Sequence, residues 1–216
     1  MQIYQPDSIR WLGFESLSPE KLTHALFTRR GGVSPVPWAE LNMGGTVGDA
    51  PENVLENNRR ALRAVGQSPD RVFDVWQVHS ADVIRADAPR MMGIAHHKAD
   101  AIITNQPGVT LMMRFADCVP ILLYDPIQHA VGLVHAGWQG TVKKVVKSAI
   151  QAMKLAYRTN PRDLLAGIGP SICADHYQVG GDVVESVRAS FGQDAMIVLQ
   201  DVEGQVLRGP QIVARV

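Results

Sequence analysis

The sequence predicts an α/β fold, built as one domain around a layered sheet core. The chain has 216 residues, of which 46% are hydrophobic, and this is enough to bury the core of one large domain. Several short apolar segments between residues 72 and 134 have the pattern of strands that are buried on both faces, as in the interior of a layered structure. Helical patterns lie on either side of them, and no repeat, low-complexity stretch or linker divides the chain.

The elements of the first half follow from local patterns. Residues 23–28 are expected to form a strand that leads into a basic, glycine-rich turn at residues 29–34. The backbone N–H groups of this turn are candidates for binding phosphate, and a plain hairpin loop is an equal alternative. A helix is expected over residues 51–65, because start signals precede a periodic apolar pattern and a glycine follows it. Further strands are expected near residues 72–78, 82–86, 100–104, 109–115, 119–124 and 130–134.

The second half continues with helices and one more strand. From residue 140 to about residue 158, apolar side chains fall on one helical stripe and lysines face outward, which predicts a single helix. A strand at residues 163–168 and a helix at residues 182–191 complete the pattern. His135 therefore lies at a joint between a strand and a helix, where functional residues are often placed on a rigid scaffold.

Composition limits the class of ligand. The 21 basic and 21 acidic side chains cancel, so no charge surplus favours nucleic acid or an anionic membrane surface as a partner. No segment has the roughly 18 uninterrupted apolar residues of a membrane helix, and the N-terminus lacks the pattern of a signal peptide. We therefore expect a cytoplasmic protein that binds a small molecule. Its two cysteines are not expected to form a disulfide in that compartment, and no pattern sets the oligomeric state.

Three side chains of metal-ligand type lie where apolar strands end, namely His79, Cys118 and His135. Two imidazoles and one thiolate suit Zn²⁺ or copper, and three protein ligands leave a fourth position for water or substrate. The three residues are 39 and 17 positions apart, so a preformed fold must bring them together. The sequence therefore predicts a catalytic metal site rather than a structural zinc finger.

Other candidate residues lie near this trio in the sequence. Trp138, between two glycines, offers a flat surface on which an aromatic ring can stack. Asp117 is the candidate proton shuttle because it is adjacent to Cys118. Arg114 ends an apolar strand and needs an anionic partner, for which Asp117 and a substrate phosphate are the candidates. Cys173 follows a turn signal and is expected to be structural.

Eight short motifs follow one another between about residues 23 and 181. They are TRRGGVS at 28–34, LNMG at 41–44, VGD at 47–49, QVH at 77–79, ADA at 99–101, ADCVPI at 116–121, HAGWQGT at 135–141 and GIGPSI at 167–172. Together they resemble the laccase-domain, or polyphenol oxidoreductase, family of purine nucleoside phosphorylases. Similar proteins continue past this C-terminus with a further strand, a helix and an arginine-containing end, whereas this chain stops at Val216. We expect either that this tail is absent or that the natural chain is shorter.

The resemblance implies a layered α/β/β/α fold with mixed sheets, as one domain over residues 1–216, and a zinc ion held by His79, Cys118 and His135. Copper remains the alternative metal. The implied reaction is phosphorolysis of adenosine, inosine and S-methyl-5'-thioadenosine to the free base and ribose or methylthioribose 1-phosphate. Deamination of adenosine to inosine is the implied second activity. The expected partners are therefore purine nucleosides and inorganic phosphate.

This reaction assigns roles to several polar residues. Phosphate must attack the sugar carbon while charge develops on the departing base, which requires an anion site and a polarising group. Arg29, Arg30 and Arg114 are the candidates for binding phosphate, and Asn42 is the candidate for orienting the ribose or the base. For deamination, zinc would activate a water molecule, with Asp117 as the candidate for moving the proton.

Three other functions remain open. In a metal-free cysteine hydrolase that edits peptidoglycan precursors, Cys118 would be the nucleophile and His79 or His135 the base. A copper-dependent polyphenol oxidase would match the older description of the family, although three ligands cannot supply a multi-copper relay. The last alternative is a protein that binds nucleosides without converting them.

Overall fold

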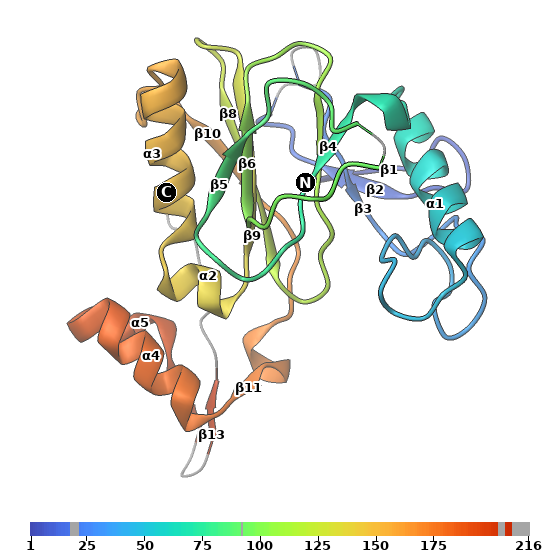
Figure 1. The fold of residues 1–216 in the computed structure, drawn as a ribbon. Helices are drawn as coiled ribbons and strands as arrows, with labels where there is room; N and C mark the ends of the chain where they lie inside the picture. The colour runs from blue at the N-terminus through green and yellow to red at the C-terminus, as the bar shows by residue number, and fades with distance from the viewer. Residues whose placement is uncertain (18–21, 92, 203–205, 209–216) are drawn as a thin grey trace.

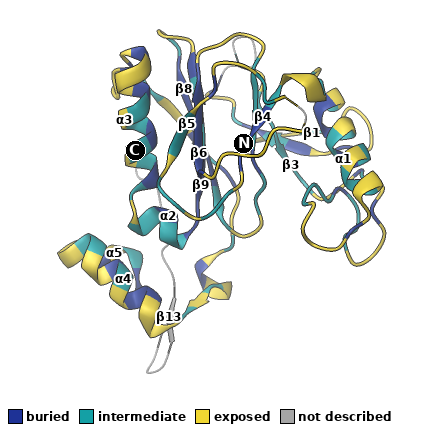
Figure 2. Cartoon of the chain, viewed as in Figure 1, coloured by how far each residue is buried: buried dark blue, intermediate teal, exposed yellow. Residues whose placement is uncertain are grey.

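A computed structural model describes residues 1–17, 22–91, 93–202 and 206–208. Its centre is a five-stranded mixed sheet in the order β10-β8-β9-β6-β5. The strands β5 and β6 run parallel, and the other neighbouring pairs run antiparallel. The five strands are β5 (Val83–Arg85), β6 (Ala101–Thr104), β8 (Val119–Asp125), β9 (Ala130–Ala136) and β10 (Leu165–Ile168). Figure 2 shows that buried residues are concentrated on β6, β8 and β9, as expected for a sheet covered on both faces.

One face of this sheet is covered by helix α3 (Val145–Tyr157), as Figure 1 shows. Val145, Ala149 and Met153 of the helix are fully buried and share a hydrophobic cluster with Ile103 and Ile121 of the sheet. Residues two apart on a strand point to the same face, so the neighbouring residues of β6 and β8 point to the other face of the sheet.

The opposite face is covered by two smaller sheets and a helix. The parallel pair of β4 (Val72–Asp74) and β7 (Thr110–Met112) packs on Ile102 through Phe73. The antiparallel sheet of β1 (Gln2–Tyr4), β2 (Trp11–Gly13) and β3 (Leu26–Phe27) lies beside this pair. Helix α1 (Pro51–Ala64) packs outside this second sheet. The order of helix, sheet, sheet and helix confirms the predicted α/β/β/α layers with mixed sheets.

The chain after residue 177 adds a small lobe below the sheet (Figure 1). Helix α4 (Gly181–Phe191) packs on the short helix α2 (Trp138–Val142). The contact is made by Val183, Val184 and Val187 of α4, which share a cluster with Trp138 and Val142. No helix in the ranges that the structure describes has the length and apolarity needed to cross a bilayer. The lobe consists of β11 (Gln178–Val179), α4 (Gly181–Phe191), α5 (Ala195–Val198), β12 (Gln200–Val202) and β13 (Val206–Arg208).

The prediction of one helix over residues 140–158 is wrong. The chain forms α2 (Trp138–Val142) and then α3, separated by Lys143 and Lys144. Lys144 has a left-handed backbone, with φ of 63°, and its ammonium lies 3.1 Å from the centroid of the Phe191 ring. This break redirects the chain, because α2 packs on α4 whereas α3 packs on the central sheet. The helices predicted over residues 51–65 and 182–191 are confirmed as α1 and α4.

A buried polar network holds the loop between β3 and α1. The amide Nδ2 of Asn57, which is fully buried, donates to Ser34 Oγ and to the carbonyl of Asn42, both at 2.8 Å. The Asp49 carboxylate accepts hydrogen bonds from Ser34 Oγ at 2.6 Å and from Asn42 Nδ2 at 2.9 Å. Burial alone would raise the pKa of Asp49, but its hydrogen bonds outweigh this effect and hold the pKa at about 2, below the usual 3.8.

The pKa of Asp49 leads to a prediction for acid unfolding. A carboxyl group whose pKa is lowered by folding stabilises the protein above its unfolded-state pKa, and this stabilisation is lost as the pH falls towards its folded-state pKa. The contribution of Asp49 should therefore disappear between pH 3.8 and about pH 2. We expect Asp49→Asn to be less stable than the native chain at neutral pH and to lose less stability across this window. The free energy of unfolding, measured in urea at a series of pH values, tests both expectations, with Asp7→Asn, a change at an exposed residue, as the control. If this free energy depends on pH in the same way in the native chain and in Asp49→Asn, the prediction is wrong.

Candidate metal centre

The three predicted ligands meet at one end of the central sheet. His135 is the penultimate residue of β9, and Cys118 immediately precedes β8. The antiparallel register pairs Pro120 with His135, so the start of β8 lies beside the end of β9. His79 comes from the link between β4 and β5 and has a left-handed backbone, with φ of 57°. The ligand atoms of the three side chains all lie within 4.8 Å of one another.

These separations suit a single metal ion. Cys118 Sγ lies 3.9 Å from His79 Nε2. A tetrahedral zinc ion with ordinary bond lengths separates a sulfur ligand from a nitrogen ligand by about 3.5 Å. The rings of His79 and His135 lie 5.1 Å apart between centroids and are inclined by 60°, so both approach one point from different directions. The group formed by His79, Cys118 and His135 could therefore hold a metal ion.

Asp100, directly before β6, fixes the orientation of His135. Its Oδ1 lies 2.8 Å from His135 Nδ1, and its carbonyl accepts a hydrogen bond from the backbone N–H of His135, also at 2.8 Å. An Nδ1–H donated to this carboxylate leaves Nε2 unprotonated and free to bind a metal, which is the usual arrangement of metal-ligating histidines. Both residues are buried, with 0% and 4% of their surfaces exposed, so water does not compete for this contact.

The same carboxylate also fixes the loop that carries His79. The second oxygen, Asp100 Oδ2, accepts hydrogen bonds from the backbone N–H groups of Val78 and Ser80 at 3.1 and 2.6 Å. It also accepts one from Ser80 Oγ at 3.0 Å. Asp100 therefore holds both histidines at once, one through its ring and the other through the two residues that flank it.

Gly137 leaves the space that the side chains of Cys118 and His79 occupy beside it. A Cβ atom at this position would lie 2.9 Å from Cys118 Sγ and 2.9 Å from His79 Cδ2, closer than real contacts permit. Its backbone, with φ of −76° and ψ of 176°, is one that any residue adopts. The requirement for glycine at this position is therefore the space beside the two ligands rather than the backbone conformation.

Gly137→Ala is expected to lower zinc affinity by at least about tenfold, because the added methyl group pushes two ligands apart while the fold is kept. Zinc affinity measured by competition with a chelator, together with thermal unfolding, checks both parts of the prediction. Gly45→Ala is the matched control, because a Cβ there has no neighbour within 4 Å. Unchanged zinc affinity in Gly137→Ala would show that the ligands do not need this space.

Electrostatics at the centre favour a bound cation. Burial raises the pKa of the Cys118 thiol, and the charges of Asp117 and Asp100 raise it further. Burial also lowers the pKa of His135, against the opposing influence of Asp100. Both shifts favour a neutral thiol and a neutral imidazole. A divalent cation would offset the negative charges and hold the sulfur as a thiolate.

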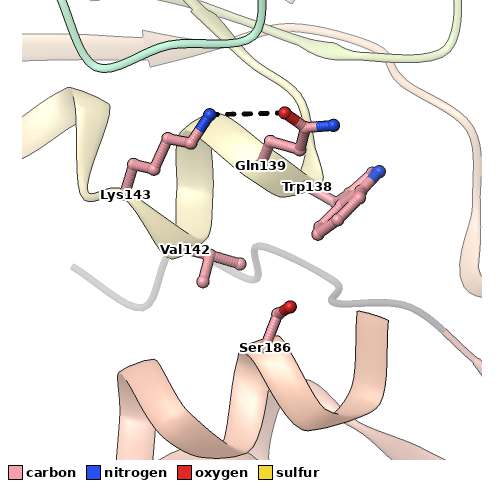
Figure 3. Close-up of a pocket in the computed structure, with 5 residues that line it drawn as sticks. All are labelled: Trp138, Gln139, Val142, Lys143 and Ser186. Atoms are coloured by element: carbon pink, nitrogen blue, oxygen red, sulfur yellow. Dashed lines mark hydrogen bonds between the residues drawn. The ribbon is translucent and has the colours of Figure 1, made fainter. Parts of the chain in front are cut away.

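Trp138 and Asp117 are close to members of the trio in the sequence. Trp138 begins α2 and lines a pocket of about 180 Å³ with Gln139, Val142, Lys143 and Ser186 (Figure 3). Asp117 is exposed and has a left-handed backbone, with φ of 70°. Its carbonyl accepts a hydrogen bond from the N–H of Ile172 at 3.0 Å. Its carboxylate acts on the Cys118 thiol through its charge.

The predicted partner of Arg114 needs correction. The Arg114 guanidinium contacts the buried carboxylate of Asp74 at 3.2 and 3.3 Å rather than Asp117, and its Nε donates to the carbonyl of Met43 at 2.7 Å. Asp74 also pairs with Arg90 and lies 3.2 Å from His96. Sequence reasoning missed Asp74 because it lies 40 positions away, on a different strand.

The basic turn at residues 29–34 is occupied by the protein itself. Glu40 accepts a hydrogen bond from the backbone N–H of Gly31 at 2.8 Å and pairs with Arg30 at 3.2 Å. Arg29 Nε donates to the carbonyl of Ala39 at 2.8 Å. The Asn42 side chain is likewise bonded within its own loop, to Asp49 and Gly44. The predicted phosphate cradle therefore holds a carboxylate of the same loop.

The structure adds two residues that sequence reasoning missed. Asp100 could have been suspected, because an acidic side chain at the start of a buried strand requires partners. Tyr177 gives no such signal. Burial raises its pKa, and the charges of Cys118 and Asp117 raise it further.

Comparison with known proteins identifies a family, named relatives and a solved structure that this chain resembles. A family model described as "Multi-copper polyphenol oxidoreductase laccase" matches residues 23–208. A Streptomyces griseus protein named as a purine nucleoside phosphorylase is 42% identical over 193 residues, covering 85% of this chain and 78% of the relative. A Deinococcus radiodurans protein of the same name is 39% identical over 167 residues, and the match covers 77% of this chain but 63% of that relative. The crystal structure of YlmD from Geobacillus stearothermophilus superposes with a TM-score of 0.87 and 29% identity, covering 96% of this chain and 78% of the other.

Proposed function

The chain belongs to the multi-copper polyphenol oxidoreductase laccase family, and from this we propose that it is a zinc-dependent purine nucleoside phosphorylase acting as one domain. The observation that carries the proposal is the approach of His79, Cys118 and His135 to within 4.8 Å of one another. Two nitrogen donors and one sulfur donor suit zinc. Two relatives that are 39% and 42% identical to this chain over the aligned residues carry the name of this activity.

The three side chains would hold the zinc ion and leave one position open. When bound, zinc would supply Lewis-acid polarisation of the nucleoside or of water. Asp100 keeps His135 Nδ1 protonated and its Nε2 directed to the site, and it keeps the His79 loop in place through Ser80. Trp138 would stack on the purine. The substrates are adenosine, inosine and S-methyl-5'-thioadenosine, with inorganic phosphate as the attacking group.

Deamination of adenosine to inosine is the proposed second activity. It needs a group that moves a proton between water and the purine. Asp117 is exposed beside Cys118 and is available for this role. Tyr177 is a further candidate, because the charges of Cys118 and Asp117 act on its phenol and a phenol can donate a hydrogen bond.

The alternatives are less well supported by the geometry. A cysteine hydrolase needs a nucleophile activated by a neighbouring base, and Cys118 Sγ lies 3.9 Å from His79 Nε2, at the long end of a hydrogen bond to sulfur. The raised pKa of Cys118 also disfavours the reactive thiolate in the absence of a metal. A copper oxidase of phenols relies on several copper ions, and the described residues contain one group of three ligands.

Product analysis tests the proposed function. Purified protein is incubated with adenosine in the presence and absence of phosphate, and adenine, inosine and ribose 1-phosphate are resolved. Adenine and ribose 1-phosphate that form only with phosphate support phosphorolysis, and inosine that forms without phosphate supports deamination. If neither adenine nor inosine exceeds the level of a Cys118→Ala control, the proposal fails.

A further inference from the structure

Phosphorolysis requires an anion site, and the arginines singled out from the sequence already have protein partners. Arg30 pairs with Glu40, and Arg114 pairs with Asp74. Arg29 donates to the carbonyl of Ala39. The two carboxylates neutralise their partners, so a phosphate at either arginine would have to compete with an ion pair that is already formed.

Lys143 differs from these arginines. Its Nζ donates to the backbone carbonyl of His79 at 2.8 Å and to Gln139 Oε1 at 3.3 Å, and both acceptors are uncharged. No ion pair joins Lys143 to a carboxylate among the residues that the structure describes. An ammonium group has three N–H donors, so one donor and the full positive charge remain available for an anion.

The contacts of Lys143 place this charge beside the metal centre. The carbonyl that it binds belongs to His79, one of the three candidate ligands. Lys143 and Gln139 line a pocket with Trp138, Val142 and Ser186, and Figure 3 shows their polar ends joined on the side of α2 away from Ser186. The Gln139 amide nitrogen makes no hydrogen bond within the described part of the chain, so it offers further donors.

We propose that Lys143 and Gln139 form the binding site for inorganic phosphate, on the side of α2 where the Lys143 ammonium meets the carbonyl of His79. This proposal rests on the proposed phosphorolysis. In that reaction a phosphate oxygen forms a bond to C1′ of the ribose, and the C1′–N9 bond breaks with its electron pair leaving on the purine. The purine then takes one proton from solvent. Lys143 places the attacking anion next to the residue that helps to hold the metal.

Lys143→Gln tests the site. We expect the KM for phosphate to rise about tenfold or more, because a charge-assisted hydrogen bond is lost. The KM for inosine, the zinc content and kcat at saturating phosphate should change less than about twofold. Lys143→Arg should restore most of the phosphate affinity, because the charge is kept. Lys147→Gln is the matched control, since Lys147 is an exposed lysine four residues further along the chain.

The outcomes separate this proposal from the proposed function. If Lys143→Gln phosphorolyses inosine with an unchanged KM for phosphate, the phosphate site is wrong and the phosphorylase activity stands. A loss of zinc together with a lower kcat and an unchanged phosphate KM would show that Lys143 only supports the His79 loop, which also overturns the site. If the native protein has no phosphorylase activity, binding of inorganic phosphate is measured by calorimetry in the zinc-loaded protein. Binding that is weakened in Lys143→Gln supports the site, and binding that is equal or absent in both overturns it.

Discussion

Cys118→Ala is expected to lose its bound zinc and to lower phosphorolysis of adenosine by more than about 100-fold. Even a change in a residue that only supports a metal ligand costs roughly 10–100-fold in affinity or activity, and Cys118 supplies one of three donors. The thiolate is also the one negatively charged ligand in the trio, so its removal leaves two neutral imidazoles to hold a divalent cation. Zinc affinity by chelator competition and initial rates with adenosine and phosphate measure the two losses.

Cys173→Ser is the matched control for this substitution. Cys173 is the second of the two cysteines in the chain, and its Sγ lies 2.9 Å from His176 Nδ1, outside the group of three ligands. This variant should keep zinc and activity. A Cys118→Ala protein that retains both would show that the centre does not depend on the thiolate. Full activity of the native protein without metal, lost in Cys118→Ala, would instead identify a cysteine nucleophile.

Asp100→Asn is expected to lower zinc affinity by roughly 10–100-fold with a much smaller effect on folding. An amide has one acceptor oxygen in place of two. If this oxygen stays with the Ser80 loop, the amide N–H faces His135 Nδ1, and the imidazole must then carry its proton on Nε2. The lone pair that would bind the metal is lost in that tautomer. Chelator competition measures zinc affinity, and urea unfolding measures stability.

Asp125→Asn is the control for the loss of a buried carboxylate. Asp125 is 1% exposed and ends β8, where it accepts hydrogen bonds from the backbone N–H groups of Ile127 and Gln128. We expect this variant to lose stability but to keep its zinc affinity. Equal zinc affinity in Asp100→Asn and the native chain would show that Asp100 does not orient the histidine ligands.

The parts of the fold with strong periodic patterns could be predicted from the sequence. Helices α1 and α4 have clear amphipathic patterns, and the strands β6, β8 and β9 are almost continuously apolar. Their order also placed His135 and Cys118 at strand ends. Because β8 and β9 pair antiparallel, the start of β8 lies beside the end of β9. This pairing brings together Cys118 and His135, two of the three candidate ligands.

Other features depend on contacts that local patterns do not contain. The break between α2 and α3 arises because α2 packs on the lobe and α3 packs on the central sheet. The apolar stripe in the sequence continues through the break, so the stripe alone does not reveal it. Strands such as β1 and β11, with three and two residues, are too short to show a period. The C-terminal residues 211–216, after which a further segment was expected from the resemblance, lie outside the described residues.

The polar residues show the same limit most clearly. Arg114 was recognised as needing an anionic partner, but its partner Asp74 lies 40 positions away and could not be identified from the sequence. The turn at residues 29–34 has the composition of an anion site, and Glu40 from the same loop occupies it. Residue type indicated which groups need a partner, and the fold determined which partner each group found.

The most direct test of the central claim is a zinc titration of the metal-free protein with phosphorolysis as the readout. Protein stripped by a chelator should be inactive with adenosine and phosphate, and activity should rise linearly to a plateau at about one zinc per chain. A His79→Ala protein should show neither binding nor recovery at the same zinc concentration. Full phosphorolysis by the stripped native protein, or a plateau reached equally by His79→Ala, would contradict a catalytic zinc held by His79, Cys118 and His135.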